Sequence, residues 1–274
     1  MRECPEAGVD ELTGLVQAVL GSAKYRHVCE DVIRNVGSRE LARRPNLKEA
    51  IKATKNKLHQ VGAAYQAGRM DYDRWLDALG TTASSGDRQR FLQVCREVMK
   101  GHSSTRERAD ILDEFYARTL ASLSGIRTVL DIACGLNPLA IPWMPLDRDL
   151  EYHAYDMYTD MVAFLSQFLD LAGVRGQAEA RDVSRFPPTR RADLALILKS
   201  LPCMEQLDKS ASVRLLEATN ADHLLISFPV RSLGGRGKGM AQSYERQFLG
   251  LLAGKPWAFR RFEFSTELAF LVSK

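Results

Sequence analysis

The chain has 274 residues and a formal net charge of +4, with 26% charged and 45% hydrophobic residues. At roughly 150 residues per domain, this length predicts one large domain or two modest ones. The composition excludes wholesale disorder, a collagen-like repeat and a disulfide scaffold. No run approaches the ~18 uncharged apolar residues that span a bilayer, and the N-terminus has no signal-peptide core, so we expect a soluble, cytoplasmic protein.

The cysteines do not form a recognisable framework. They are odd in number and widely scattered, and no pair has CxxC spacing: Cys4, Cys29, Cys95, Cys134 and Cys203. Neither a zinc knuckle nor a set of disulfides is predicted. We therefore expect no metal site, and reduced thiols that are mostly buried.

The positive charge is concentrated in two stretches. Ten basic and four acidic residues lie between Lys24 and Lys57, and seven basic residues and one acidic residue lie between Arg231 and Arg261. Clustered cations are typical of proteins that bind a phosphate backbone, because each neutralised phosphate releases counterions. A single basic cluster is more often a solvated helical face. Two clusters, in a chain that also carries the motifs described below, favour a nucleic-acid-binding function.

The first ~125 residues predict consecutive helices, because their apolar residues recur with a period of 3.6. One helix is expected over 24–36, ending near Gly37, and a longer one over 46–65. The longer helix carries Lys48, Lys52 and Lys55 on one face. Further helices are predicted over 71–79, with Asp71 as its cap, and over 85–99 and 104–123.

After Gly125, short apolar runs alternate with helices. Strands are predicted over 128–134, 151–157, 177–183, 192–200 and 222–230, with a closing hairpin over 257–265 and 267–274, and helices over 158–173, 210–220 and 239–254. This alternation is typical of a doubly wound α/β sheet, to which the hairpin adds one antiparallel strand. The layout is that of S-adenosylmethionine methyltransferases. We predict a Rossmann-like methyltransferase domain with a seven-stranded, mostly parallel sheet over 101–274, preceded by an all-helical domain over 1–100.

Three consecutive strand ends carry residues suited to a cofactor, and ligands bind at such ends in open α/β sheets. The first strand is followed by a turn containing Ala133 and Gly135, where glycine lets the backbone approach a ligand. Asp156 lies 21 residues after Gly135, the position of an acidic residue that binds ribose hydroxyls. Asp182 ends the third strand, where its carboxylate or the Val183 amide can address an adenine. Each acidic residue alone is more often a cap or loop residue, but the ordered set is more specific.

The turn after the first strand lacks the G-x-G-x-x-G pattern, since Gly135 is its one glycine. Without the glycines that accommodate a pyrophosphate, the turn favours S-adenosylmethionine over NAD.

The segment "HSSTRER" precedes the helix that leads to the first strand, and we place His102, Ser103 and Arg108 beside the cofactor. Arg108 can pair bidentately with the methionine carboxylate. The alternative is an ion pair within the helix, which requires an acidic residue three or four positions away. Those positions hold Ser104, Thr105, Ile111 and Leu112.

Taken together, "HSSTRER", "DIACGLNPLA", "YHAYDM", "LKSLPCMEQ" and "ISFPVRSLGGRGKGM" resemble motifs of the aminoglycoside-resistance methyltransferases of small-subunit ribosomal RNA. The resemblance covers essentially the whole chain, and it is to the enzymes of aminoglycoside-producing actinomycetes that modify guanine N7 in the decoding site. It implies S-adenosylmethionine as cofactor, 16S rRNA in the assembled 30S subunit as substrate, and a helical domain that docks on rRNA.

Two other functions rank lower. A related group methylates a nearby adenine at N1, but its members are usually shorter and lack such a helical extension. An RNA-binding module that has lost methyl transfer is a third possibility, against which the near-complete cofactor set argues. We expect a monomer without a membrane or DNA partner.

Guanine N7 carries a lone pair and no proton, so its methylation needs orientation rather than a general base. In the segment after the fourth strand, Leu198 is expected to pack on the adenine, Lys199 to hold a phosphate or base edge, and Glu205 to accept hydrogen bonds from the guanine. Alternatively, Lys199 is solvated and Glu205 caps the next helix. Pro202-Cys203 also matches the placement of the nucleophilic cysteine in cytosine-C5 methyltransferases, although a buried thiol is the commoner role.

The glycine-rich loop "RSLGGRGKG" after the fifth strand is the second basic feature. Arg231 and Lys238 are expected to bind RNA phosphates, and Arg236 to act beside the target base. A surface loop with incidental charge is the alternative.

Overall fold

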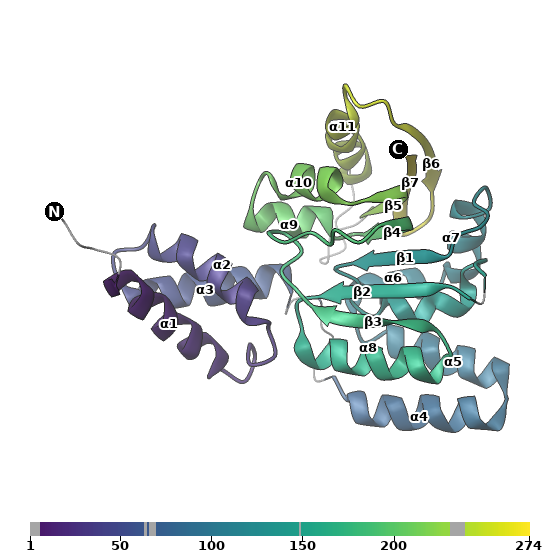
Figure 1. Cartoon of the computed structure of the whole chain (residues 1–274), viewed down its shortest axis with the longest axis horizontal. Helices are drawn as coiled ribbons and strands as arrows, with labels where there is room; N and C mark the ends of the chain where they lie inside the picture. Colours follow the sequence, from purple (N-terminus) through teal and green to yellow (C-terminus); the bar gives the residue numbers. More distant parts are fainter. Residues whose placement is uncertain (1–5, 63–64, 66–69, 148, 231–238) are drawn as a thin grey trace.

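The structure, a computed structural model, describes residues 6–62, 65, 70–147, 149–230 and 239–274. A central sheet lies between layers of helices, and a group of N-terminal helices projects from the carboxyl edge of the sheet (Figure 1). Among the described helices, none combines the length and apolar character needed to cross a membrane.

The sheet has seven strands in the order β3-β2-β1-β4-β5-β7-β6. The strands are β1 (Thr128–Ile132), β2 (Glu151–Asp156), β3 (Arg175–Ala180), β4 (Ala192–Leu198), β5 (Ala221–Pro229), β6 (Ala258–Glu263) and β7 (Glu267–Ser273). β1 to β5 run parallel to one another, whereas β7 runs antiparallel to both β5 and β6. The predicted fold class and the single antiparallel strand are confirmed.

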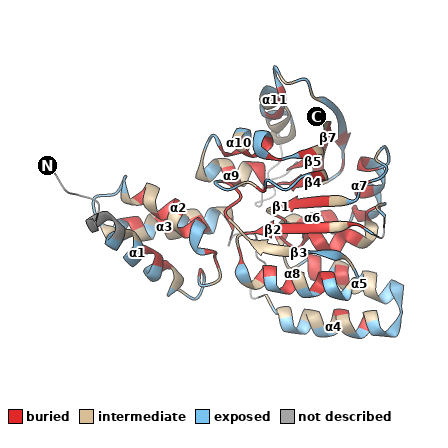
Figure 2. Ribbon diagram, viewed as in Figure 1, coloured by how far each residue is buried: buried red, intermediate tan, exposed pale blue. Residues whose placement is uncertain are grey.

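Two buried clusters lie on opposite faces of the sheet, because successive strand residues point to opposite sides. Val129 and Leu194 belong to one cluster, while Leu130 and Ala195 belong to the other. The first cluster packs beneath α8 (Thr159–Leu171) and its neighbours, and the second beneath α10 (Ala211–Ala218) and α11 (Met240–Leu252). Burial on both faces explains the nearly continuous apolar runs of these strands, which Figure 2 shows as buried.

The N-terminal helices divide into two groups. α1 (Glu6–Leu20), α2 (Glu30–Leu41) and α3 (Leu47–Val61) pack on one another, and we call them the helical unit. α4 (Tyr72–Ser85) and α5 (Arg88–Met99) pack together, with α4 against α8 and α5 against the 3-10 helix η2 (Asn137–Trp143). The packing therefore changes between α3 and α4, earlier than the domain boundary predicted at residue 100.

Side-chain caps explain several helix starts. Asn46 Oδ1 accepts a hydrogen bond from the Glu49 amide at 3.0 Å, and Asp71 Oδ1 accepts one from the Arg74 amide at 3.4 Å. The predicted cap at Asp71 is confirmed.

Gly37 does not end a helix, contrary to the prediction. It lies buried inside α2, and a Cβ at this position would be only 2.5 Å from Cδ2 of Leu15 in α1. The glycine therefore allows α1 and α2 to approach closely rather than marking a turn.

Two further helical predictions need correction. The helix expected over 104–123 is two helices, α6 (Ser103–Ala109) and α7 (Leu112–Thr119). The segment after β4, for which no helix was expected, contains α9 (Leu201–Leu207), with Pro202 in its first turn. Proline suits this position because its missing N–H has no partner there in any helix.

The helical unit is joined to the sheet at the turn after β2. The Cys29 amide donates to the Met157 carbonyl at 2.8 Å, and the Thr159 amide donates to the His27 carbonyl at 2.8 Å. This short antiparallel pairing places α2 beside the carboxyl ends of β2 and β3.

Candidate cofactor site

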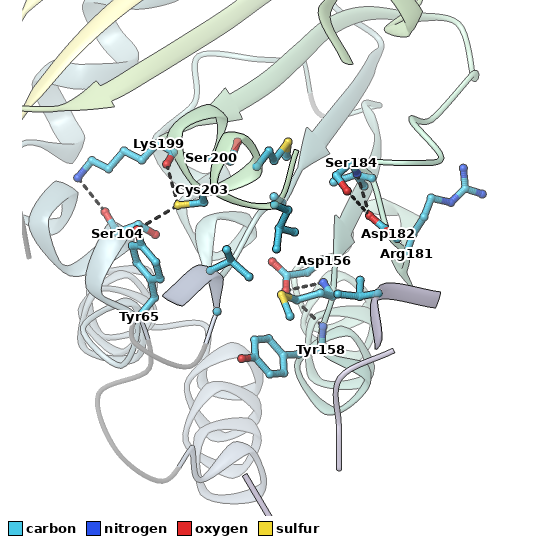
Figure 3. A pocket seen from close by; sticks show the side chains of 18 of the residues that line it. Tyr65, Ser104, Asp156, Tyr158, Arg181, Asp182, Ser184, Lys199, Ser200 and Cys203 are labelled. Atoms are coloured by element: carbon cyan, nitrogen blue, oxygen red, sulfur yellow. Dashed lines mark hydrogen bonds between the residues drawn. The ribbon is translucent and has the colours of Figure 1, made fainter. Parts of the chain in front are cut away.

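A cavity opens at the carboxyl ends of the strands, at the edge where the sequence predicts a cofactor (Figure 3). The space within it, including its open mouth, is about 740 Å³. Its lining from the sheet domain includes Ala133, Asp156, Met157, Tyr158, Asp182, Val183, Leu198, Lys199, Ser200 and Cys203.

The turn after β1 shapes the floor of the cavity. Ala133 and Gly135 both have φ of 53°, in the left-handed region that favours glycine. A Cβ at Gly135 would lie 3.0 Å from Cε1 of His102, so the glycine also permits a close approach. Ala133 lines the cavity, whereas Gly135 acts through its amide, which donates to Asp156 Oδ2 at 2.9 Å.

Asp156 is held rigidly in the cavity wall. Besides the Gly135 amide, its carboxylate accepts the Met157 amide at 2.7 Å and the Tyr158 amide at 3.3 Å. Burial raises the pKa of Asp156, and these N–H donors oppose part of that rise. The structure places Asp156 where its spacing from Gly135 predicted, and its contact with ribose hydroxyls stays a prediction.

Asp182 lies farther along the same wall, after β3. Its Oδ1 accepts hydrogen bonds from the Ser184 amide and hydroxyl at 3.1 and 2.6 Å. Its Oδ2 accepts one from Nδ2 of Asn35, in α2, at 2.6 Å. Asp182, Val183 and Leu198 all line the cavity, and their contacts with an adenine stay predictions.

The cavity fits S-adenosylmethionine by two tests. The hydroxyls of Tyr158 and Ser200 are buried there without a hydrogen-bond partner among the described residues, so a polar ligand would satisfy them. Val183 and Leu198 offer apolar surface suited to an adenine, close to the Asp156 carboxylate suited to a ribose. These residues would hold the cofactor, which when bound supplies an electrophilic sulfonium methyl group.

Arg108 does not line the cavity, in contrast to its predicted role at the methionine carboxylate. The Arg108 side chain is 1% exposed. Its Nη2 donates a hydrogen bond to Glu267 Oε2 at 2.9 Å, and its Nη1 donates one to Asn137 Oδ1 at 2.8 Å. Arg108 Nε also lies 2.9 Å from Glu267 Oε1, forming a bidentate pair. The acidic partner of Arg108 lies outside its own helix, because Glu267 belongs to β7.

Lys199 is not solvated, contrary to the alternative reading, while its expected contact with a phosphate or base edge stays a prediction. It is 5% exposed, and its Nζ donates to Glu107 at 2.8 Å and lies 3.2 Å from Glu267 Oε1. We call Arg108, Glu267, Lys199 and Glu107 the buried ion network. Burial raises the pKa of Glu267, but Arg108 and Lys199 outweigh this effect and lower it.

Of the other residues predicted near the cofactor or the base, His102 lines the cavity, whereas Ser103 and Glu205 do not. His102 lines the cavity and stacks on Tyr65 with a 6.0 Å centroid separation; burial, reinforced by Lys199, lowers the pKa of His102 to about 4. Ser103 is buried but lies outside the lining. Glu205 is inside α9, where it accepts a hydrogen bond from Gln247 in α11, so it is neither a cap nor directed at the cavity.

Cys203 lines the cavity, and its thiol donates a hydrogen bond to Tyr65 Oη at 3.0 Å. Burial raises the pKa of Cys203, which keeps the thiol protonated at neutral pH and makes it a poor nucleophile. Cys29, Cys95 and Cys134 are buried, as predicted.

The predicted RNA-binding residues lie away from the cavity or outside the described part of the chain. Lys48 and Lys52 are exposed on α3, and Lys55 is half-exposed. Arg231, Arg236 and Lys238 lie outside the described residues. The RNA contacts of both groups stay predictions.

The helical unit supplies part of the cavity that the sequence did not indicate. Val32 of α2 and Val61 of α3 line it, together with Gly62 and Tyr65. These are ordinary apolar and turn residues, and only the packing of α2 and α3 against the strand ends gives them this position. No local pattern carried a signal for them.

Comparison with known proteins agrees with this architecture. Residues 21–271 match the family model described as "Ribosomal RNA methyltransferase (FmrO)". A protein of Frankia casuarinae named "16S rRNA (guanine(1405)-N(7))-methyltransferase" is 36% identical over 94% of this chain and 92% of its own length. A Serratia marcescens protein of the same name is 33% identical over 94% of this chain and 96% of its own length.

Solved structures give the same picture. The 16S rRNA methyltransferase RmtF, crystallised in complex with S-adenosyl-L-homocysteine, is similar with a TM-score of 0.82 and 31% identity, covering 99% of this chain and 100% of RmtF. The 16S rRNA methylase RmtB is similar with a TM-score of 0.76 and 28% identity over 96% of this chain and 98% of RmtB. The family model spans nearly the whole sequence, and the structure has the sheet and the cavity described above. The chain therefore belongs to the ribosomal RNA methyltransferase (FmrO) family.

Proposed function

We propose that this protein transfers the methyl group of S-adenosylmethionine to N7 of a guanine in the decoding A-site of 16S rRNA, within the assembled 30S subunit. The observation that carries the proposal is the cavity at the strand ends. Relatives that match this chain over nearly their full length are named guanine-N7 methyltransferases. Methylation there would confer resistance to aminoglycosides that bind the site.

The chemistry requires little of the chain beyond positioning. Guanine N7 attacks with an existing lone pair, so no side chain has to remove a proton before the methyl group moves. The Asp156 and Asp182 carboxylates are fixed by backbone and side-chain donors, which preorganises the wall against which the cofactor would lie. A guanine held in a helix would have to unstack to reach the cavity.

We infer a division of labour between the two parts of the chain. The exposed lysines of α3 dock on rRNA phosphates, while the cavity holds the cofactor and receives the base. The protein then acts as a cytoplasmic monomer on the ribosomal subunit.

The test is methylation of purified 30S subunits, with free 16S rRNA and 50S subunits as controls. Borohydride–aniline treatment cleaves RNA at N7-methylguanosine, and primer extension then maps a stop at the decoding site. A stop that needs this treatment and appears only on 30S subunits supports the proposal. A stop at an adenine without the treatment would instead identify an adenine-N1 enzyme, and transfer to free rRNA alone would contradict the 30S substrate.

A further inference from the structure

We propose that Asn35 of α2 is a positioning residue for the cofactor, which makes the helical unit a structural part of the cofactor site as well as the docking unit. The inference rests on the proposed function, because it concerns the same cofactor. Its subject is the hydrogen bond between Asn35 Nδ2 and Asp182 Oδ2, which joins residues 147 positions apart at 2.6 Å.

The contact is buried on both sides. Asn35 is 3% exposed and Asp182 is 2% exposed, so water does not compete freely for the bond. A buried hydrogen bond to a charged acceptor is stronger than a neutral one, and removing the donor leaves the carboxylate oxygen unsatisfied.

The two oxygens of Asp182 have different partners. Oδ1 is held from within its own loop by Ser184 and by the Arg185 amide at 3.3 Å. For Oδ2, the described residues provide one donor, Asn35. The orientation of the carboxylate about its terminal bond therefore depends on a residue of the helical unit.

The same helical face reaches the cavity itself. Val32 lies three residues before Asn35, so both side chains are on one side of α2, and Val32 lines the cavity. The approach of α3 is equally close, since a Cβ at Gly62 would lie 2.6 Å from Tyr158 Oη. The wall next to Asp182 is thus built jointly by α2, α3 and the strand ends.

A second contact across the same seam offers a matched control. Arg39, one turn after Asn35, donates to the Leu207 carbonyl at 2.9 Å and pairs with Asp208 at 3.1 Å. Arg39 does not line the cavity and does not contact Asp182. Its removal loosens the seam without releasing Asp182 Oδ2.

The experiment measures the Kd of S-adenosylhomocysteine by calorimetry for the full-length wild-type protein and for Asn35→Ala, Asn35→Asp and Arg39→Ala. We expect Asn35→Ala to raise the Kd about tenfold, as for loss of one charge-assisted hydrogen bond. Arg39→Ala should stay within about twofold of the wild type, because the affected contact lies elsewhere on the seam.

Asn35→Asp provides a readout that a purely structural role would not change. It places two carboxylates next to each other, so affinity should be lost at high pH and recovered at low pH, where the pair shares a proton. The wild type should show no such recovery. This arm keeps the inference testable if Asn35→Ala fails to fold.

Three outcomes would overturn the inference: unchanged affinity in Asn35→Ala, an equal loss in Arg39→Ala, or an Asn35→Asp profile parallel to that of the wild type. Each would leave the proposed function standing, since the wild type still binds the ligand. Absence of S-adenosylhomocysteine binding by the wild type would overturn both.

Discussion

Asp156 has two tasks, because it faces the cavity while accepting the amides of Gly135, Met157 and Tyr158. Alanine would release all three amides. Asp156→Asn is the milder change, because its oxygen can still accept the Met157 and Tyr158 amides, although its Nδ2 would then face the Gly135 N–H. Loss of the charge should weaken binding by ~1.5–3 kcal/mol, about tenfold or more in Kd for S-adenosylhomocysteine. Calorimetry checks this, with the exposed Asp170→Asn as a control, and equal affinities would place the cofactor elsewhere.

Cys203 is next to the cavity without being equipped as a nucleophile. Burial raises the pKa of its thiol, and Tyr65 Oη accepts its hydrogen bond. Cys203→Ala should therefore retain methylation of 30S subunits in a single-turnover assay. Abolished turnover in a folded variant would favour covalent catalysis of the cytosine-C5 type, which 5-fluorocytosine-containing RNA would trap.

Glu267 balances two buried cations, so its charge matters for stability. Glu267→Gln leaves Arg108 and Lys199 short of a counter-charge and should cost about 3–5 kcal/mol of unfolding free energy, measured with urea. Because the pKa of Glu267 is lowered from 4.5, its contribution is complete above pH 4.5 and is lost as the pH falls through the lowered value. The difference between wild type and variant should therefore shrink in acid. A difference independent of pH would contradict the ionised state.

Sequence reasoning at the residue scale succeeded where the signal was local. Asp156 ends β2 and Asp182 closely follows β3, and strand ends converge on one edge of a parallel sheet. The partner of Arg108 was out of reach, since Glu267 is 159 positions away and reaches it only through the placement of β7. The burial of Lys199 beside Glu267 was out of reach for the same reason.

Among the elements, α3 offers the clearest test of docking. Lys48→Glu with Lys52→Glu should weaken binding to 30S subunits and flatten its salt dependence, because fewer counterions are released. Arg88→Glu with Arg90→Glu on α5 makes the same charge change on the sheet domain and serves as the matched control. Binding of S-adenosylhomocysteine should be unaffected in both. Unchanged subunit affinity in the α3 variant would show that the helical unit is not the docking surface.

Element prediction failed where tertiary packing changed the meaning of a residue. Gly37 is a helix breaker by propensity, yet in α2 it provides the space that Leu15 of α1 occupies. α9 was missed because its seven residues are too short for a periodic signal, and they follow β4 without a capping side chain. The central strands β1, β4 and β5, by contrast, were visible because burial on both faces demands nearly uninterrupted apolar residues.

At the scale of the whole molecule, the parts are less separate than a docking domain and a catalytic domain would be. The sequence indicated a helical half and a sheet half, but α4 packs on α8 and α5 on η2, and the helical unit lines the cavity. Changes in composition along the chain predict secondary structure well. They predict contacts between distant segments poorly. The site therefore extends farther into the N-terminal region than its motifs suggest.

The position of β7 has a consequence for how the protein folds. This strand is the last of the sheet in sequence, yet it is inserted between β5 and β6, and its first residue is Glu267. The buried ion network thus has a high contact order, and closing it requires ordering most of the chain. A partly folded chain that lacks β7 would hold Arg108 without its counter-charge, so completion of the sheet and assembly of the network should occur in the same late folding step.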